Sequence, residues 1–365
     1  MTATDQMTAT DQRPWLIYGA YGFTGRMIVE EAIRRGHRPV LGGRDPKRLR
    51  ELAQQTGLPH TAIRLDDARA LREQIASHSL VLNAAGPFAE TGRPLNEASL
   101  ATRTPYLDVA GEIDHLRFVA DLDQRARNAG VALLTGAGFG VTFGDCLARH
   151  VAERLPDATH LRLSVDARNA QTTPAVQRTV LRVLADGGYA VEGGKWRSRP
   201  LGHAAWSVSD GSETASFASA PLGELAAVHG WAKAANIVVG RPMAASAARQ
   251  LRLLSPLIKG ALRIGPLREW LGRSKGNDAP VAAPEPAGGW RSQVWAEAWN
   301  ARGERVISRL ETGEGYAATA RAAIANAETL ATADLRGAFT PASAFGADHV
   351  LKIPGVSRVD VGATH

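Results

Sequence analysis

Short apolar runs alternate with stretches in which apolar residues recur at helical spacing, from Trp15 to about residue 138. In residues 23–35, for instance, Ile28, Val29 and Ala32 fall on one helical face. Strands that alternate with helices indicate a parallel sheet covered by helices on both faces. The expected strands are residues 15–18, 37–43, 60–65, 80–86, 104–111 and 130–138.

The regular alternation of strand and helix patterns ends at about Phe143. A strand is expected at residues 159–168 and a helix at 173–188. Residues 290–313 read as two strands around a turn at 300–303, and a helix is expected from Tyr316 to about Ala331. The fold class is therefore α/β, with a Rossmann-type doubly wound parallel sheet, plus a second α+β domain with a mixed sheet.

The first strand and first helix are joined by a loop with glycines three residues apart. Because the first glycine ends a strand and the last opens a helix, backbone N–H groups face a diphosphate above the positive end of that helix. A purely structural tight turn is the alternative. The residues expected to bind a dinucleotide here are Gly19, Tyr21, Gly22, Phe23, Thr24 and Gly25.

The end of the second strand bears on the choice of dinucleotide. An acidic residue there would hold the ribose hydroxyl of NAD, whereas a cation would accept the 2′-phosphate of NADP. Arg44 follows the strand, with Lys47 and Arg48 close behind, while Asp45 is ambiguous. We therefore expect NADPH rather than NADH, unless these charges are only the solvated first turn of a helix.

Two further strand ends are expected to meet the same cofactor. In an open parallel sheet, ligands bind beyond the carboxyl ends of the strands. Asp66 ends the third strand, where it contacts the adenine side or caps the next helix together with Asp67. The fourth strand ends in the sequence NAAGP, and the residues expected to contact the cofactor there are Asn83, Ala85, Gly86 and Pro87.

Composition and charge change this picture little. The 365 residues carry a formal net charge of +7 and are 44% hydrophobic, as in a folded globular protein. The single cysteine excludes an internal disulfide and a multi-cysteine zinc site, and no metal is expected. Residues 1–12 repeat one hexapeptide and read as a disordered tail without a signal-peptide core, so we expect a cytoplasmic protein.

Four stretches together resemble the saccharopine dehydrogenase-like reductases, and more closely the branch of trans-acting enoyl reductases. They are YGAYGFTGR, GGRDPKRL, LNAAGPFAETGRPLNEASLATRTPYLDVAGE and LRGAFTPASAFG. The resemblance implies that the C-terminus returns to the nucleotide domain, with residues 340–351 as the returning helix. The expected domains are residues 13–142 with 336–365 for NADP binding and residues 143–335 for substrate binding and dimerisation.

The resemblance also points to catalytic candidates. Asp108 and Glu112 match the family stretch at the end of the fifth strand, and Tyr316 matches the pattern GEGYAAT. Glu112 is alternatively a helix cap, and Tyr316 alternatively a packing residue. The chain departs from the family at residues 136–140, GAGFG, where a cysteine and an aspartate are commonly found.

Residues 243–275 combine seven cations with leucines and isoleucines and contain one acid, Glu269. This composition suits docking of an acidic acyl carrier protein, or peripheral contact with a membrane. Packed helices with solvated arginines are the plain alternative. No nucleic-acid-binding module is recognisable, so we expect no nucleic acid partner. A homodimer is a further expectation.

The sequence thus predicts an NADPH-dependent reductase of a conjugated C=C in an acyl or polyketide-type substrate, carrier-bound or free. The first alternative is an imine reductase or amino-acid dehydrogenase of the saccharopine type, whose substrate carboxylates would need arginines such as Arg168, Arg178 and Arg197. The second is a nucleotide-binding or membrane-associated scaffold without catalysis.

Overall fold

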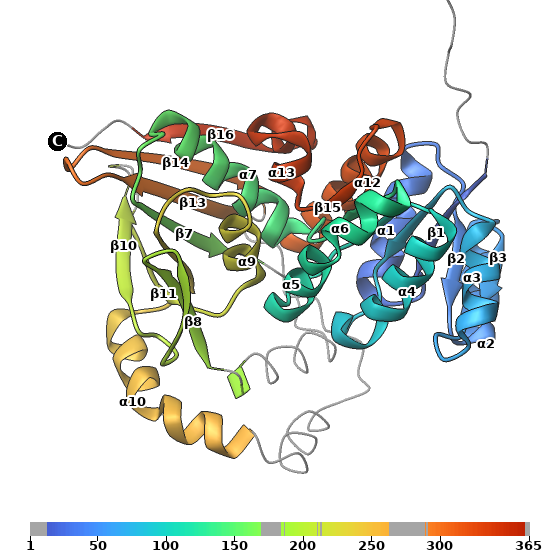
Figure 1. Ribbon diagram of the computed structural model, residues 1–365, viewed down its shortest axis with the longest axis horizontal. Helices are drawn as coiled ribbons and strands as arrows, with labels where there is room; N and C mark the ends of the chain where they lie inside the picture. Colours follow the sequence, from blue (N-terminus) through green and yellow to red (C-terminus); the bar gives the residue numbers. More distant parts are fainter. Residues whose placement is uncertain are drawn as a thin grey trace, which may run out of the picture.

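Two sheets organise the chain in a computed structural model (Figure 1). The expected tail at 1–12, most of the helix expected at 173–188 and most of the loop at 276–289 lie outside the described residues. The described residues are 13–168, 184–185, 187–209, 211, 214–262, 289 and 291–361.

The first sheet consists, in the described chain, of seven parallel strands in the order β15-β6-β5-β4-β1-β2-β3. β1 lies between β2 and β4, so the chain reverses its direction of winding at β1 and leaves a crevice beyond the strand ends. The Rossmann-type sheet expected from the sequence is confirmed. The strands are β1 (Trp15–Tyr18), β2 (Val40–Gly43), β3 (His60–Ala62), β4 (Leu80–Asn83), β5 (Tyr106–Asp108), β6 (Ala132–Leu134) and β15 (Gly337–Phe339).

Helices cover this sheet because each buries one apolar face. In the first helix, Ile28, Val29 and Ala32 are fully buried against strand residues such as Ile17 and Leu41. The helices of this part are α1 (Phe23–Arg34), α2 (Pro46–Thr56), α3 (Ala68–Ala76), α4 (Phe88–Thr102), α5 (Ile113–Asp121) and α6 (Asp123–Ala129).

The second sheet is mixed and antiparallel in most of its pairings, with the order β10-β11-β12-β7-β13-β14-β16 and a β8–β9 hairpin attached to β12. Helix α7 (Phe139–Arg154) packs across it through side chains such as Phe143 and Leu147. The expected second sheet is confirmed. Its strands are β7 (His160–Asp166), β8 (Gly188–Glu192), β9 (Lys195–Arg199), β10 (Ala205–Ser209), β11 (Thr214–Ser219), β12 (Asn236–Pro242), β13 (Ser292–Trp299), β14 (Arg305–Thr312) and β16 (Ser357–Val361).

The C-terminal segment divides between the two sheets, which differs from the boundary expected at residue 336. β15 pairs with β6 in the parallel sheet, but β16 pairs with β14 in the mixed sheet. Between them, α13 (Pro341–Phe345) and the 3₁₀ helix η1 (Ala347–Lys352) pack on α7, while Ala344 and Phe345 also contact the core of the parallel sheet. The reason is apolar burial, because Ala342, Val350 and Ile353 belong to the core under the mixed sheet.

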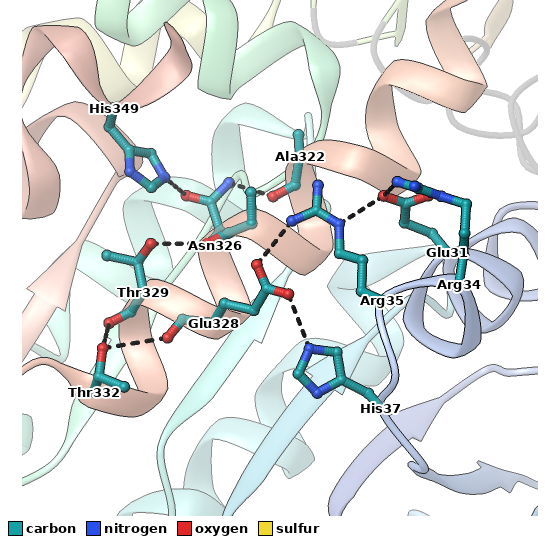
Figure 2. Close-up of polar contacts among 11 residues, drawn as sticks. Glu31, Arg34, Arg35, His37, Ala322, Asn326, Glu328, Thr329, Thr332 and His349 are labelled. Atoms are coloured by element: carbon teal, nitrogen blue, oxygen red, sulfur yellow. Dashed lines mark hydrogen bonds and ion pairs between the residues drawn. The ribbon is translucent and has the colours of Figure 1, made fainter. Parts of the chain in front are cut away.

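Helix α12 (Gly315–Thr332) packs against both domains, and its Ala318, Ala322 and Ala325 belong to the core under the mixed sheet. Ala320, Ala323 and Ile324 are buried in the core formed by α1 and the parallel sheet. Figure 2 shows the polar tie between these helices: Arg35 donates to Glu31 and to Glu328, each at 2.8 Å. The carboxyl end of α12 is thereby held beside the carboxyl end of α1.

A buried polar group joins α12 to the C-terminal segment. His349 Nε2 lies 3.1 Å from Asn326 Oδ1, and Asn326 Nδ2 donates to the carbonyl of Ala322 at 2.9 Å (Figure 2). His349 is only 1% exposed, and its Nδ1 has no partner among the described residues. Burial, with a smaller contribution from Lys352, lowers the pKa of His349 to about 4.

The fold should therefore lose stability as pH falls. Between pH 6.5 and 4 the unfolded chain binds a proton at residue 349 that the folded protein excludes, so the contribution present at pH 7 shrinks on acidification. We expect His349 to account for about 2 kcal/mol of unfolding free energy lost between pH 7 and pH 5. Urea unfolding of the wild type and His349→Gln at both pH values measures this, and equal losses in the two proteins would contradict it.

Candidate functional site

The loop between β1 and α1 is a tight cradle that two glycines make possible. Gly19 has φ +85°, and a Cβ there would lie 2.8 Å from the Cβ of Ala85. A Cβ at Gly25 would collide with the carbonyl oxygen of Gly19. The Gly22 N–H donates to Gly19 O at 2.9 Å and closes the turn. Strand β1, helix α1 and the end of β4 therefore approach at backbone distance, as a dinucleotide-binding loop requires.

The amino end of α1 is open to an anion. Gly22 occupies the N-cap, the first turn contains no acidic residue, and within the described chain no side chain caps this end. The first amides of a helix lack partners within the helix and carry its positive partial charge. A pyrophosphate fits this combination of free amides and absent side chains.

The cations at the end of β2 are separated from the nearby acid. The Asp45 carboxylate accepts from the backbone N–H of Lys47 at 2.9 Å and of Arg48 at 3.2 Å, so it caps α2. Arg44 and Lys47 are exposed, whereas Arg48 stacks over the Tyr21 ring at 4.5 Å. Asp45 is thus committed to its own helix, and the positive charge of Arg44 remains at the position that faces a ribose.

Asp66 and Asp67 have different roles at the end of β3. Asp67 caps α3 through the backbone N–H groups of Arg69 and Ala70, at 3.1 and 3.0 Å. Asp66 instead accepts from Arg64 Nε at 3.0 Å and is exposed. Asp66 is therefore not a helix cap, and its contact with adenine stays a prediction.

Asn83 is fully buried, and its side chain fixes the backbone of the NAAGP segment, residues 83–87. Its Oδ1 accepts from the Ala85 N–H at 3.0 Å, and its Nδ2 donates to Tyr106 Oη at 3.1 Å. Asn83 therefore holds Ala85 against Gly19 rather than presenting its own side chain to the crevice. Gly86 is exposed and Pro87 half-buried beside that wall, where a cofactor would meet them.

Asp108 is a buried anchor and not an exposed acid. It is 0% exposed, and its carboxylate contacts His115 Nε2 at 2.6 Å and accepts from Thr135 Oγ1 at 2.9 Å and the Gly136 N–H at 3.1 Å. Burial by itself raises the pKa of Asp108, but the charge and hydrogen bond of His115 and the backbone donors outweigh it and lower the pKa. The same carboxylate raises the pKa of His115 against the opposing effect of burial.

Glu112 also has a structural role. Its two carboxylate oxygens accept from the backbone N–H groups of Phe88 and Ala89, each at 3.1 Å. It occupies the N-cap position of α5, yet its side chain caps the neighbouring helix α4. The geometry of Asp108 and Glu112 therefore does not favour the catalytic roles expected from the sequence, because both carboxylates are occupied in holding the loop after β5.

Tyr316 lies beside the glycine loop. It stands in the first turn of α12, half-buried, with its ring edge-on to Phe23 at a centroid distance of 4.8 Å. Phe23 is the first residue of α1. The fold thus brings the Tyr316 phenol, 293 residues after Phe23 in the sequence, to the candidate cofactor site, which sequence spacing alone does not reveal.

The turn at residues 136–140 joins α12 to a carboxyl group that the sequence did not single out. A Cβ at Gly138 would lie 3.3 Å from Thr319 Cγ2 of α12, and a Cβ at Gly140 would lie 2.5 Å from Glu224 Oε1. Glu224 stands in the first turn of α9 (Gly223–His229) and is 3% exposed. Burial raises the pKa of Glu224, partly offset by its own backbone amide and by Arg241.

Glu224 was missed because its surroundings come from distant segments. The Gly223 N–H donates to Gly111 O at 3.0 Å, which sets α9 against the loop after β5. In the sequence PLGELAAVHG only the isolated acid in an apolar run marks the position. The structure adds that α12, which contains Tyr316, and α9, which contains Glu224, both approach this turn.

Two of the arginines considered as ligands of substrate carboxylates lie in different parts of the second domain. Arg168 forms an ion pair with Asp166 at 2.7 Å, and Arg197 stands on the β9 strand. Arg178 lies outside the described residues. Of the basic stretch 243–275, the part up to residue 262 is described and forms α10 (Ala245–Leu262).

Comparisons with known proteins agree with the geometry of the first domain. Residues 15–134 match the family model described as saccharopine dehydrogenase NADP binding domain. A probable mitochondrial saccharopine dehydrogenase-like oxidoreductase of Arabidopsis thaliana is 31% identical over 141 residues, covering 34% of this chain and 31% of that protein. The trans-acting enoyl reductase of Mycobacterium tuberculosis is 32% identical over 133 residues, covering 34% and 32%.

These matches span about a third of the relatives' length. The fold likeness extends further: apo saccharopine dehydrogenase (L-Glu forming) of Saccharomyces cerevisiae superposes with a TM-score of 0.64 at 13% identity, covering 96% of this chain and 100% of that one. The resemblance expected from the sequence is confirmed over residues 15–134, which match the saccharopine dehydrogenase NADP binding domain.

Substitutions of Asp108 and Glu112 test whether these carboxylates have the structural roles that their contacts indicate. Asp108→Asn removes a charge that His115 and several donors require, and we expect it to lower the unfolding free energy by about 3–5 kcal/mol. Glu112→Gln, which weakens only a helix cap, should cost about 0.5–2 kcal/mol. Urea unfolding measures both, and an Asp108→Asn protein as stable as the wild type would contradict the anchoring role.

Proposed function

We propose that this protein is an NADPH-dependent reductase that saturates a conjugated C=C in an acyl thioester substrate. The observation that carries the cofactor assignment is the pairing of the open α1 amino end with Arg44, whose acidic neighbour Asp45 is committed to capping α2. The NADP-binding domain match supports the same cofactor. The substrate class draws on the trans-acting enoyl reductase relative.

The chain's own residues divide the binding task. The amides at the start of α1 hold the pyrophosphate, Arg44 and Lys47 meet the 2′-phosphate, and the NAAGP segment flanks the sugar or nicotinamide. When bound, NADPH supplies the hydride. The remaining task for the protein is to polarise the thioester carbonyl and deliver one proton to the α-carbon.

Two side chains are suited to that proton. The Tyr316 phenol stands at the glycine loop beside Phe23. Glu224 lies behind the turn at 136–140, where burial raises its pKa and favours the protonated acid at Oε1 or Oε2. We propose Tyr316 as the donor and Glu224 as the second candidate, because the Tyr316 ring contacts Phe23 of the glycine loop and is less buried than Glu224.

The imine-reducing alternative depends on arginines that bind substrate carboxylates. Arg168 is engaged by Asp166, and Arg178 lies outside the described residues. The enoyl thioester therefore remains the preferred substrate class. Turnover of NADPH with a 2-enoyl thioester and with a cyclic imine separates the two reactions, and turnover with neither favours the non-catalytic scaffold.

The cofactor assignment is tested by replacing Arg44. Arg44→Gln removes a charge-assisted contact to the 2′-phosphate and should raise the Kd for NADPH about 10- to 100-fold while leaving NADH binding nearly unchanged. Arg38→Gln is the matched control, because Arg38 is exposed at the opposite end of β2. Fluorescence titration measures both cofactors. Equal wild-type affinity for NADPH and NADH would overturn the assignment.

The proton donor is tested with two conservative variants. Tyr316→Phe should lower kcat about 100-fold or more, the usual contribution of a general acid, with the Kd for NADPH unchanged. Glu224→Gln should have a smaller effect if Tyr316 is the donor. A large loss only in Glu224→Gln transfers the role to Glu224, and full turnover in both variants removes both residues from the mechanism.

A further inference from the structure

Helix α10 presents an apolar face that stays exposed in the described part of the chain. Leu253, Leu254 and Leu257 are 74%, 51% and 71% exposed. The other exposed large apolar side chains of the described chain, Ile33, Leu351 and Val359, are distant in sequence from this helix. Single exposed leucines are ordinary, whereas three within five residues of one helix form a patch that needs a partner.

The opposite face of α10 is fixed to the protein. Ala248, Ser255 and Leu262, spaced by seven residues, are buried. The Leu201 N–H donates to Ser255 Oγ at 2.9 Å. A helix has 3.6 residues per turn, so the exposed leucines project away from this buried line. Figure 1 shows α10 at the edge of the molecule, away from α1 and α12. The patch is thus separate from the candidate active site.

Positive charge accompanies the leucines. Arg249, Arg252 and Lys259 lie on the same helix, which contains no aspartate or glutamate. A helix with one apolar outward face and basic residues beside it is typical of binding at a membrane interface. In the described part of the chain no helix is long and apolar enough to cross a bilayer. Contact would therefore be with the surface of the bilayer.

We propose that α10 docks the protein on a membrane surface that contains anionic lipids. Arg249 and Arg252 approach the lipid phosphates, and Leu253, Leu254 and Leu257 enter the boundary between headgroups and acyl chains. An acidic carrier protein would also attract the cations, but the exposure of three leucines favours an apolar medium over a polar protein surface. The proposal does not rest on the reductase assignment.

Vesicle sedimentation of the full chain tests this surface. The wild type should bind vesicles of phosphatidylcholine mixed with phosphatidylglycerol about tenfold or more strongly than phosphatidylcholine alone. Leu253→Gln with Leu257→Gln should lower binding to the mixed vesicles about tenfold or more. Arg249→Gln with Arg252→Gln should lower it toward the level for phosphatidylcholine alone.

The matched control is Leu351→Gln with Lys352→Gln, which removes one exposed leucine and one exposed cation elsewhere and should leave binding unchanged. Circular dichroism of each variant separates a folding defect from loss of docking. NADPH titration of each variant separates a failure of the cofactor assignment from loss of docking. The proposal is overturned if the wild type stays in the supernatant with both vesicle types, or if the control loses as much binding as the helix variants. Binding only to an acidic acyl carrier protein, with no vesicle binding, would also overturn it.

Discussion

The backbone contact among Gly19, Gly25 and Ala85 is the constraint on which the rest of the site depends. No side chain fits between the carbonyl of Gly19 and Gly25, and none fits between Gly19 and Ala85. Because these segments meet so closely, α1 starts directly beyond β1 with its amides uncapped. The candidate anion site thus follows from the packing of the backbone, and Asn83 holds Ala85 in place through a hydrogen bond.

The second domain completes the site by returning helices to the first. Helix α12 reaches α1 through buried alanines and the ion pairs of Glu31 and Glu328, which sets Tyr316 beside Phe23. Helix α9 contacts the loop after β5 through Gly111 and Gly223, which sets Glu224 beside Gly140. The buried pair Asp108–His115 and the Glu112 cap stabilise that loop. Asp108 and Glu112, which the sequence suggested as catalytic groups, therefore hold the loop after β5 in place.

Local pattern was sufficient for the strands and helices of the parallel sheet and for the turn between β1 and α1, because each of these elements depends on neighbours within about 30 residues of the chain, the length of a βαβ unit. It was insufficient where contacts join distant segments. Glu224 depends on a turn 84 residues earlier in the sequence. The roles of Asp108 and Glu112 depend on partners only 7 and 24 residues away, but these are side-chain contacts between elements, which periodicity does not specify. The sequence also did not predict that the C-terminal segment contributes a strand to each sheet. Periodicity predicts a strand but does not specify its partner, here β14 for β16.

A crystal structure of the protein soaked with NADP⁺ tests the central claim most directly. We expect the pyrophosphate to lie on the amides at the start of α1, between Gly19 and Gly25, with the 2′-phosphate against the Arg44 guanidinium and the nicotinamide on the side of Tyr316. Density for the dinucleotide at another place, or a loop between β1 and α1 that contacts no phosphate, would contradict the account.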